Sequence, residues 1–161
     1  MKDYIGIRFL LTCQYADTLK KLFENINIEK YMWYVKNSEN YVYISESCDS
    51  FLPDGIYDGN CFRKIINTPE HYIHLLSLYG VPIGKNFDIN TISNYCDYFQ
   101  SNAEIAMFSG DGMVDFYSKN INIIKTVYKN CKNNNGNFIN SSEGSIELFT
   151  IDQNTRAGFY V

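Results

Sequence analysis

Hydrophobic and polar positions follow one another along the chain in blocks, and each block predicts one element. The run from Tyr4 to Leu11 is rich in β-branched and aromatic residues, which is typical of a strand. From Ala16 to Ile26 the apolar residues recur at spacings of three and four, which indicates an amphipathic helix. We therefore expect a strand followed by a helix.

Two aromatic-rich segments separated by a polar run predict a β-hairpin. The segments are residues 31–35 and 41–44, and residues 36–40 would form the loop between them. Residues 45–60 are polar and contain several turn-forming Pro, Asp and Gly residues, so we expect a loop there. Such a loop could lie over a pocket as a lid or a rim.

The middle of the chain predicts shorter elements. Residues 62–66 indicate a short helix, residues 72–78 a strand, and residues 80–85 a break in regular structure. A helix capped by Asn90 or Thr91 should follow the break, because a polar cap there precedes an apolar face.

The clearest hairpin lies in the second half of the chain. Residues 103–108 and 113–117 flank a Gly-Asp-Gly turn, which supplies the positive φ that a tight turn requires. Asn120 then caps an amphipathic helix, and residues 146–151 indicate a strand. Residues 158–161 could form one more strand at the edge of the sheet.

The element order places the chain in the α+β class. It reads β-α-β-β-α-β followed by α-β-β-α-β, and the first six elements match the ferredoxin-like pattern. No linker separates the two halves, so we expect a single domain over residues 1–161. The sheet should be largely antiparallel, with the helices packed on one face.

Composition excludes several classes of protein. A chain of 161 residues with 45% hydrophobic and 20% charged residues can bury its own core, which excludes a disordered or collagen-like protein. The net charge of −4 and the three arginines argue against a nucleic-acid partner, because phosphate binding depends on basic side chains. No apolar run reaches the ~18–20 residues of a membrane span, and the first residues lack the layout of a signal peptide. We therefore expect a cytoplasmic protein without a membrane partner.

Candidate catalytic and metal-binding residues are few. The five cysteines are an odd number without a C-x-x-C pair, so neither a disulfide framework nor a zinc site is indicated. His71 and His74 fall at the start of the predicted strand on opposite faces, and no third metal ligand accompanies them, so we expect no metal and no cofactor. The alternative is a small enzyme or ligand-binding protein with a pocket under the 45–60 loop. Its residues would be Asp58, Cys61 and His71.

The aromatic residues carry more information than the polar ones. They make up 16% of the chain, and many of them concentrate in the predicted hairpin. Because alternate residues of a strand face opposite sides, this hairpin carries aromatic rings on both faces. It therefore has either a second covering layer or an exposed aromatic patch, and exposed Tyr and Trp dominate binding surfaces. In the second case the interaction surface consists of Tyr31, Trp33, Tyr34, Tyr41 and Tyr43.

Four short segments together resemble a known family. They are Gly6-Ile7, Tyr31-Met32-Trp33-Tyr34, Phe51-Leu52-Pro53 and Thr155-Arg156. Their order is similar to that in domain-of-unknown-function family twenty-six ninety-one, whose members are short, single-domain bacterial proteins of about this length. The resemblance covers nearly the whole chain. It implies no established activity, so it carries over no catalytic residue.

The leading hypothesis is a bacterial, cytoplasmic and non-catalytic binding module. It would use the aromatic hairpin to bind a protein partner or a second copy of the chain. The aromatic clustering, the acidic balance and the lack of a nucleophile, metal or cofactor signature all favour this hypothesis over the enzyme alternative.

Overall fold

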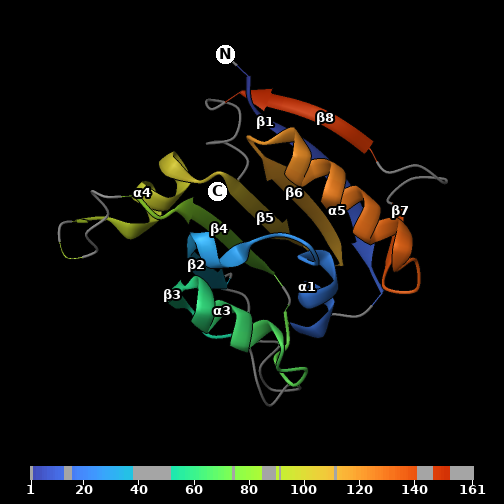
Figure 1. The fold of residues 1–161 in the computed structure, drawn as a ribbon, viewed down its shortest axis with the longest axis horizontal. Coiled ribbons are helices and arrows are strands. Elements are labelled where there is room, and N and C mark those ends of the chain that lie inside the picture. Colours follow the sequence, from blue (N-terminus) through green and yellow to red (C-terminus); the bar gives the residue numbers. More distant parts are fainter. Residues whose placement is uncertain are drawn as a thin grey trace.

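A computed structural model places most of the chain. It shows an α+β domain built on one antiparallel sheet, with helices packed against both faces (Figure 1). The described residues are 2–12, 16–37, 52–73, 75–84, 90, 92–110, 112–140 and 147–152.

The described residues form eight strands, which are β1 (Lys2–Leu11), β2 (Tyr31–Asn37), β3 (Gly55–Asp58), β4 (Leu76–Pro82), β5 (Ile105–Ser109), β6 (Met113–Ser118), β7 (Phe138–Asn140) and β8 (Glu147–Asp152). Their spatial order is β3-β2-β4-β5-β6-β1-β7, and every neighbouring pair is antiparallel. β8 also pairs with β1, on the edge that β7 uses. The two short strands therefore share one edge of β1.

The helices of the described residues are α1 (Ala16–Leu22), the 3-10 helix η1 (Ile28–Lys30), α3 (Gly59–Ile66), α4 (Tyr95–Asn102) and α5 (Ile121–Asn133). Three of them start at polar caps. The side chains of Asp58, Asn94 and Asn120 accept hydrogen bonds from backbone N–H groups in the first turns of α3, α4 and α5. None of these helices is long and apolar enough to cross a membrane.

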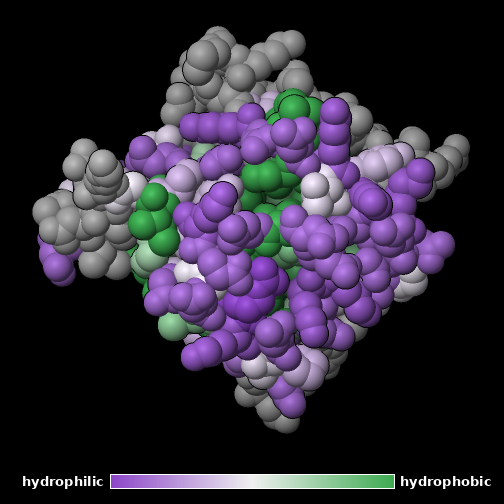
Figure 2. All heavy atoms as spheres, viewed as in Figure 1, coloured by the Kyte–Doolittle hydropathy of each residue, from purple (hydrophilic) through white to green (hydrophobic). Residues whose placement is uncertain are grey.

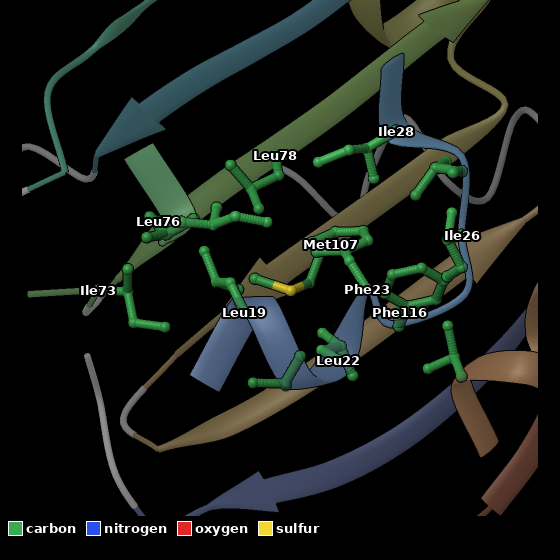
Figure 3. Packing of buried hydrophobic residues seen from close by; sticks show 14 of the residues in the cluster. Leu19, Leu22, Phe23, Ile26, Ile28, Ile73, Leu76, Leu78, Met107 and Phe116 are labelled. Atoms are coloured by element: carbon green, nitrogen blue, oxygen red, sulfur yellow. The ribbon is translucent and has the colours of Figure 1, made fainter. Parts of the chain in front are cut away.

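The larger hydrophobic core lies between one face of the sheet and the helices α1, α3 and α5. Alternate strand residues point into it, including Leu78 of β4, Met107 of β5 and Phe116 of β6. Figure 3 shows Leu19 and Leu22 of α1 among these side chains. Burial contributes about 1.5–3 kcal/mol for each such side chain, so this contact holds the helices on the sheet.

A smaller core lies on the opposite face, beneath α4. Phe99 and Ala103 pack there with Tyr79 of β4 and Tyr117 of β6. The alternation that sends Leu78 into the larger core sends Tyr79 into this one. The helices α1, α3 and α5 share one face as expected, whereas α4 covers the other, contrary to the expectation of one helical face.

The order of elements along the chain follows the expectation, but the order of strands in the sheet is not ferredoxin-like. The ferredoxin-like pattern would keep the first four strands together. Instead β1 pairs with β6, and β5 and β6 separate it from β4. The first strand is thus a neighbour of the last strands, not of β2 to β4.

Two stretches expected to be irregular are strands. β3 (Gly55–Asp58) lies inside the expected loop at 45–60, where the apolar run is only two residues long. β4 continues through Gly80, although a break was indicated at 80–85. Glycine is required at this position because a Cβ there would lie 2.9 Å from the ring of Trp33.

Other expected elements shift or lie outside the described residues. The helix expected after Asn90 or Thr91 begins at Tyr95, and Thr91 is not among the described residues. The strands expected at 41–44 and 158–161 also lie outside them. The short strand β7 has no counterpart in the sequence pattern, because three residues give no readable periodicity.

Candidate functional site

The strand that carries the aromatic cluster lies between two other strands. β2 pairs with β4 along its whole length and with β3 over residues 32–35. Both edges of β2 are therefore occupied there. The strand expected at 41–44, with Tyr41 and Tyr43, lies outside the described residues.

Trp33 is a core residue. Its side chain is fully buried and stacks on Phe62 of α3, with 4.6 Å between the ring centroids and 13° between the ring planes. The indole N–H donates a hydrogen bond to the carbonyl of Ile28 at 2.9 Å. Gly80 lies opposite in β4 and leaves the space that the ring fills. The indole therefore joins the sheet to α3 and η1.

Tyr31 lies in the same core. Its side chain is 7% exposed, and its ring centroid lies 5.6 Å from that of Trp33. Burial, together with the negative charge and the hydrogen bond of the Glu104 carboxylate, raises the pKa of Tyr31 above its ordinary value. The expectation that Tyr31 and Trp33 form an exposed interaction surface is therefore wrong, because both rings face the larger core.

Tyr34 points to the opposite face of the sheet, where it is partly exposed. Its ring centroid lies 5.4 Å from that of Phe99 in α4 and 6.1 Å from that of Tyr79 in β4. Burial raises the pKa of Tyr34, and negative charge at Cys96 and Asp54 raises it further. The phenol therefore stays protonated beside α4.

Three partly exposed side chains form an apolar patch on this face. Met32 and Tyr34 of β2 and Ile56 of β3 all pack against the smaller core, and the register places Tyr34 directly beside Ile56. We call these three residues the β2–β3 patch. Strand alternation applied to β2 would find Met32 and Tyr34. Ile56 gives no such signal, because β3 is too short to be recognised.

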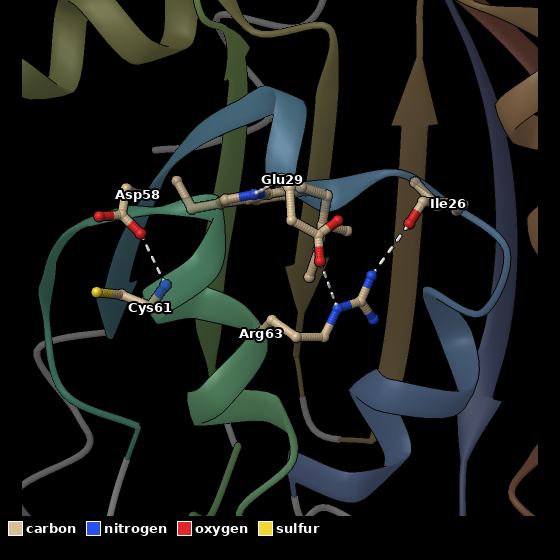
Figure 4. A network of polar contacts seen from close by, with 7 residues as sticks. Ile26, Glu29, Asp58, Cys61 and Arg63 are labelled. Carbon is tan, nitrogen blue, oxygen red and sulfur yellow. Dashed lines mark hydrogen bonds and ion pairs between the residues drawn. The ribbon is translucent and has the colours of Figure 1, made fainter.

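A network of polar contacts holds α3 from its N-cap to Arg63 (Figure 4). The Asp58 carboxylate accepts a hydrogen bond from the backbone N–H of Cys61 at 2.7 Å. The Arg63 guanidinium donates to the Glu29 carboxylate at 3.0 Å and to the Ile26 carbonyl at 3.2 Å. These contacts join α3 to the segment that precedes β2.

The residues of the enzyme alternative do not assemble an activated thiol. The Asp58 carboxylate raises the pKa of the Cys61 thiol, by a hydrogen bond and by its negative charge. Reactive cysteines need the opposite surroundings, because the thiolate is the nucleophile. His71 follows the far end of α3, where its carbonyl accepts a hydrogen bond from the N–H of Ala16 at 2.8 Å. The structure thus brings Asp58 and Cys61 together at the start of α3 and places His71 beyond its end.

Charged groups elsewhere form a structural pair. Arg8 donates to Asp115 through Nε at 2.6 Å and through Nη2 at 3.2 Å, and the two residues are partners in the register of β1 and β6. The Asp115 side chain is 10% exposed, so the guanidinium neutralises a largely buried carboxylate. Sequence reasoning misses this pair, because nothing local sets the register of β1 and β6. In the described parts of the chain, no three His, Cys, Asp or Glu side chains gather to hold a metal ion.

Comparisons with known proteins identify the family. Residues 4–149 match the family described as a protein of unknown function (DUF2691). The chain belongs to the DUF2691 family. This match confirms the family resemblance, and three of the four short segments that carried it lie within the matched residues, whereas Thr155-Arg156 lies after them.

A curated relative of this DUF2691 protein is the uncharacterized protein YncE of Bacillus subtilis (strain 168). The two are 27% identical over 128 residues, which cover 78% of this chain and 82% of the relative. No solved structure matches the chain significantly. Neither the family description nor the name of the relative states an activity, so the function is argued from the site itself.

Proposed function

We propose that this DUF2691 protein is a non-catalytic module that binds a protein partner through the β2–β3 patch. The observation that carries the proposal is the position of Met32, Tyr34 and Ile56, which stay partly exposed on the sheet face against which α4 packs. Contiguous apolar surface that remains accessible after folding is typical of interaction sites.

The shape and chemistry of the patch suit an apolar segment of another protein. Tyr34 and Ile56 are cross-strand neighbours, and Met32 lies two residues along β2 on the same face. Tyr34 offers a large, rigid ring that loses little conformational entropy on binding, and Met32 offers a flexible side chain that adapts to a partner. Tyrosine is also enriched among the residues that dominate binding energy.

The enzyme alternative has no comparable support. Its cysteine, Cys61, is held in the protonated form by Asp58, and His71 lies beyond the other end of α3. A Cys–His nucleophile needs the two side chains within hydrogen-bond reach and a thiolate that forms readily. We therefore favour the binding module over an enzyme.

A photo-crosslinking experiment tests the proposal. We replace Tyr34 of the full chain with p-benzoylphenylalanine in cells of the organism that encodes it, and irradiate. The expected result is a covalent adduct of defined mass with a partner protein. The control carries the same residue in place of Met113, which is exposed but lies in β6, three strands away from β2.

The masses of the adducts decide the outcome. An adduct with a different protein at position 34, absent at position 113, supports the proposal. An adduct of twice the chain mass of 18.7 kDa would show that the patch binds a second copy of the chain, not a different protein. No adduct at position 34, or equal adducts at both positions, would overturn the proposal. Ile56→Lys should remove the adduct at position 34, whereas Met113→Lys, in β6 and three strands away from Tyr34, should keep it.

A further inference from the structure

Helix α5 carries a row of lysines along its outer side. Lys125, Lys129 and Lys132 are spaced by four and three residues, so they share one side of the helix, and all three are exposed. α5 contains no acidic residue, although the whole chain has a net charge of −4. Positive charge is therefore concentrated on this helix.

The end of α1 extends the row. The amide of Asn130 in α5 donates to the backbone carbonyl of Glu24 at 2.7 Å, which joins α5 to the residues just after α1. Lys20 and Lys21 lie in the last turn of α1, and the Lys21 ammonium donates to the Asn137 side chain at 3.1 Å. We call Lys20, Lys21, Lys125, Lys129 and Lys132 the lysine surface.

The lysine surface is not neutralised by ion pairs. Among the described residues, no ion pair engages Lys20, Lys125 or Lys129. The acidic side chains on the neighbouring helical segment are those of Asp17 and Glu24, one before and one after the two lysines of α1. Figure 2 shows hydrophilic side chains over α5 on this side of the molecule. Like charges that lack ion-pair partners favour a negatively charged binding partner, although Lys132 also lies over the Tyr128 ring at 5.4 Å.

We propose that the lysine surface binds an acidic segment of a partner protein. The lysines of α5 span about 10 Å along the helix axis at 1.5 Å per residue. Carboxylates at the same spacings on a partner helix would face Lys125, Lys129 and Lys132 in turn. This inference goes beyond the β2–β3 patch, because α5 packs on the opposite face of the sheet.

Two other anionic partners fit less well. Base-specific reading of nucleic acid relies mainly on the bidentate arginine side chain, and neither α1 nor α5 contains an arginine. A membrane surface requires an apolar helix face that can insert between lipids. The apolar face of α5, with Ile124, Val127 and Cys131, is buried in the larger core. Carboxylates of a protein remain the chemistry that this surface matches.

Binding of a fluorescent polyglutamate peptide to the full chain tests the inference. Fluorescence anisotropy at low ionic strength should show binding that weakens as salt is added. The triple variant Lys125→Gln, Lys129→Gln, Lys132→Gln should bind at least about tenfold more weakly, because three exposed charge pairs are lost. The control is Lys30→Gln, Lys36→Gln, Lys64→Gln, which makes the same change in net charge at exposed positions elsewhere. The control should bind like the wild type.

The remaining outcomes overturn the inference. They are no binding of polyglutamate by the wild type, equal weakening in both triple variants, and tighter binding of duplex DNA than of polyglutamate at the same salt. Lys→Arg at the three α5 positions should keep binding, which separates loss of charge from loss of fold. Formation of the Tyr34 crosslink reports the β2–β3 patch alone, so the two proposals fail separately.

Discussion

At the scale of single residues, Gly80 and Trp33 form a matched pair across two neighbouring strands. The missing side chain at Gly80 lets the indole lie close against β4 and reach Phe62 of α3. Phe23 adds an edge-to-face contact, with ring centroids 5.3 Å apart. Such aromatic contacts contribute about 0.5–1.5 kcal/mol each beyond burial. A ring enclosed in this way stabilises the fold and cannot meet a partner.

Replacing Gly80 with alanine should destabilise the protein. The new Cβ would meet two carbons of the Trp33 ring at 2.9 Å, and overpacking of this kind costs about 1–3 kcal/mol. Urea denaturation followed by the fluorescence of the single tryptophan measures the loss. Gly84→Ala is the control, because nothing lies within 4 Å of its new Cβ. Equal free energies of unfolding for the two variants would contradict the packing described for Trp33.

At the scale of elements, α3 is positioned by contacts from its N-cap to Arg63. Gly59 allows a very close approach, since a Cβ there would collide with the backbone of Glu29. Arg63 then reaches the same residue, and Asp58 caps the helix. These contacts fix α3 over β2 and leave the Cys61 thiol exposed beside a carboxylate. Asp58, Gly59 and Arg63 therefore serve to attach α3 to the segment before β2. Cys61 is incidental to that role.

The thiol of Cys61 provides a test of this arrangement. Asp58→Asn should lower the pKa of Cys61, because the negative charge that disfavours the thiolate is removed. Asparagine is still a good N-cap, so α3 should remain folded. Alkylation of Cys61 by iodoacetamide near pH 8, followed by mass spectrometry, should be faster in the variant. Cys96 in the same sample is the reference, and an unchanged ratio of the two rates would contradict the assignment.

At the scale of the whole molecule, the longer elements could be predicted from the sequence, whereas the short strands β3 and β7 and the arrangement of the elements could not. The helix after Asn120 and the β5–β6 hairpin depend on local periodicity and turn residues, which are visible in the chain. The pairing of β1 with β6 depends on contacts between Ile5–Leu10 and Met113–Ser118, and no local pattern encodes them. Strand order therefore has to come from the structure.

The same distinction applies to the candidate site. Alternation along β2 correctly places Trp33 and Tyr34 on opposite faces. The alternation does not predict that α3 covers the face with Trp33, or that α4 leaves Tyr34 partly exposed. Both features depend on long-range packing. Of the residues predicted to form the interaction surface, Tyr34 is therefore part of the proposed binding patch, whereas Tyr31 and Trp33 are not.

Asn130 connects α5 to the end of α1 and gives a prediction at this scale. It is 3% exposed, and its amide donates to the carbonyls of Leu22 at 2.9 Å and Glu24 at 2.7 Å. Asn130→Leu should lower the free energy of unfolding by about 2 kcal/mol, because both carbonyls lose a donor. Guanidinium denaturation measures the change. Asn133→Leu, at an exposed position of the same helix, is the control, and an equal loss there would contradict the role of Asn130.

The partners of β1 have a consequence for how the protein is made. β1 is synthesised before the rest of the sheet, yet β6 fills one of its edges and β7 and β8 fill the other. Until the ribosome has translated β6, β7 and β8, the apolar strand β1 has no pairing partner. The native sheet therefore forms late in synthesis. Such distant pairings also slow refolding towards milliseconds to seconds. A product truncated after β6 would leave the second edge of β1 unpaired. Unpaired strand edges are sites at which chains aggregate, so we expect such a product to aggregate.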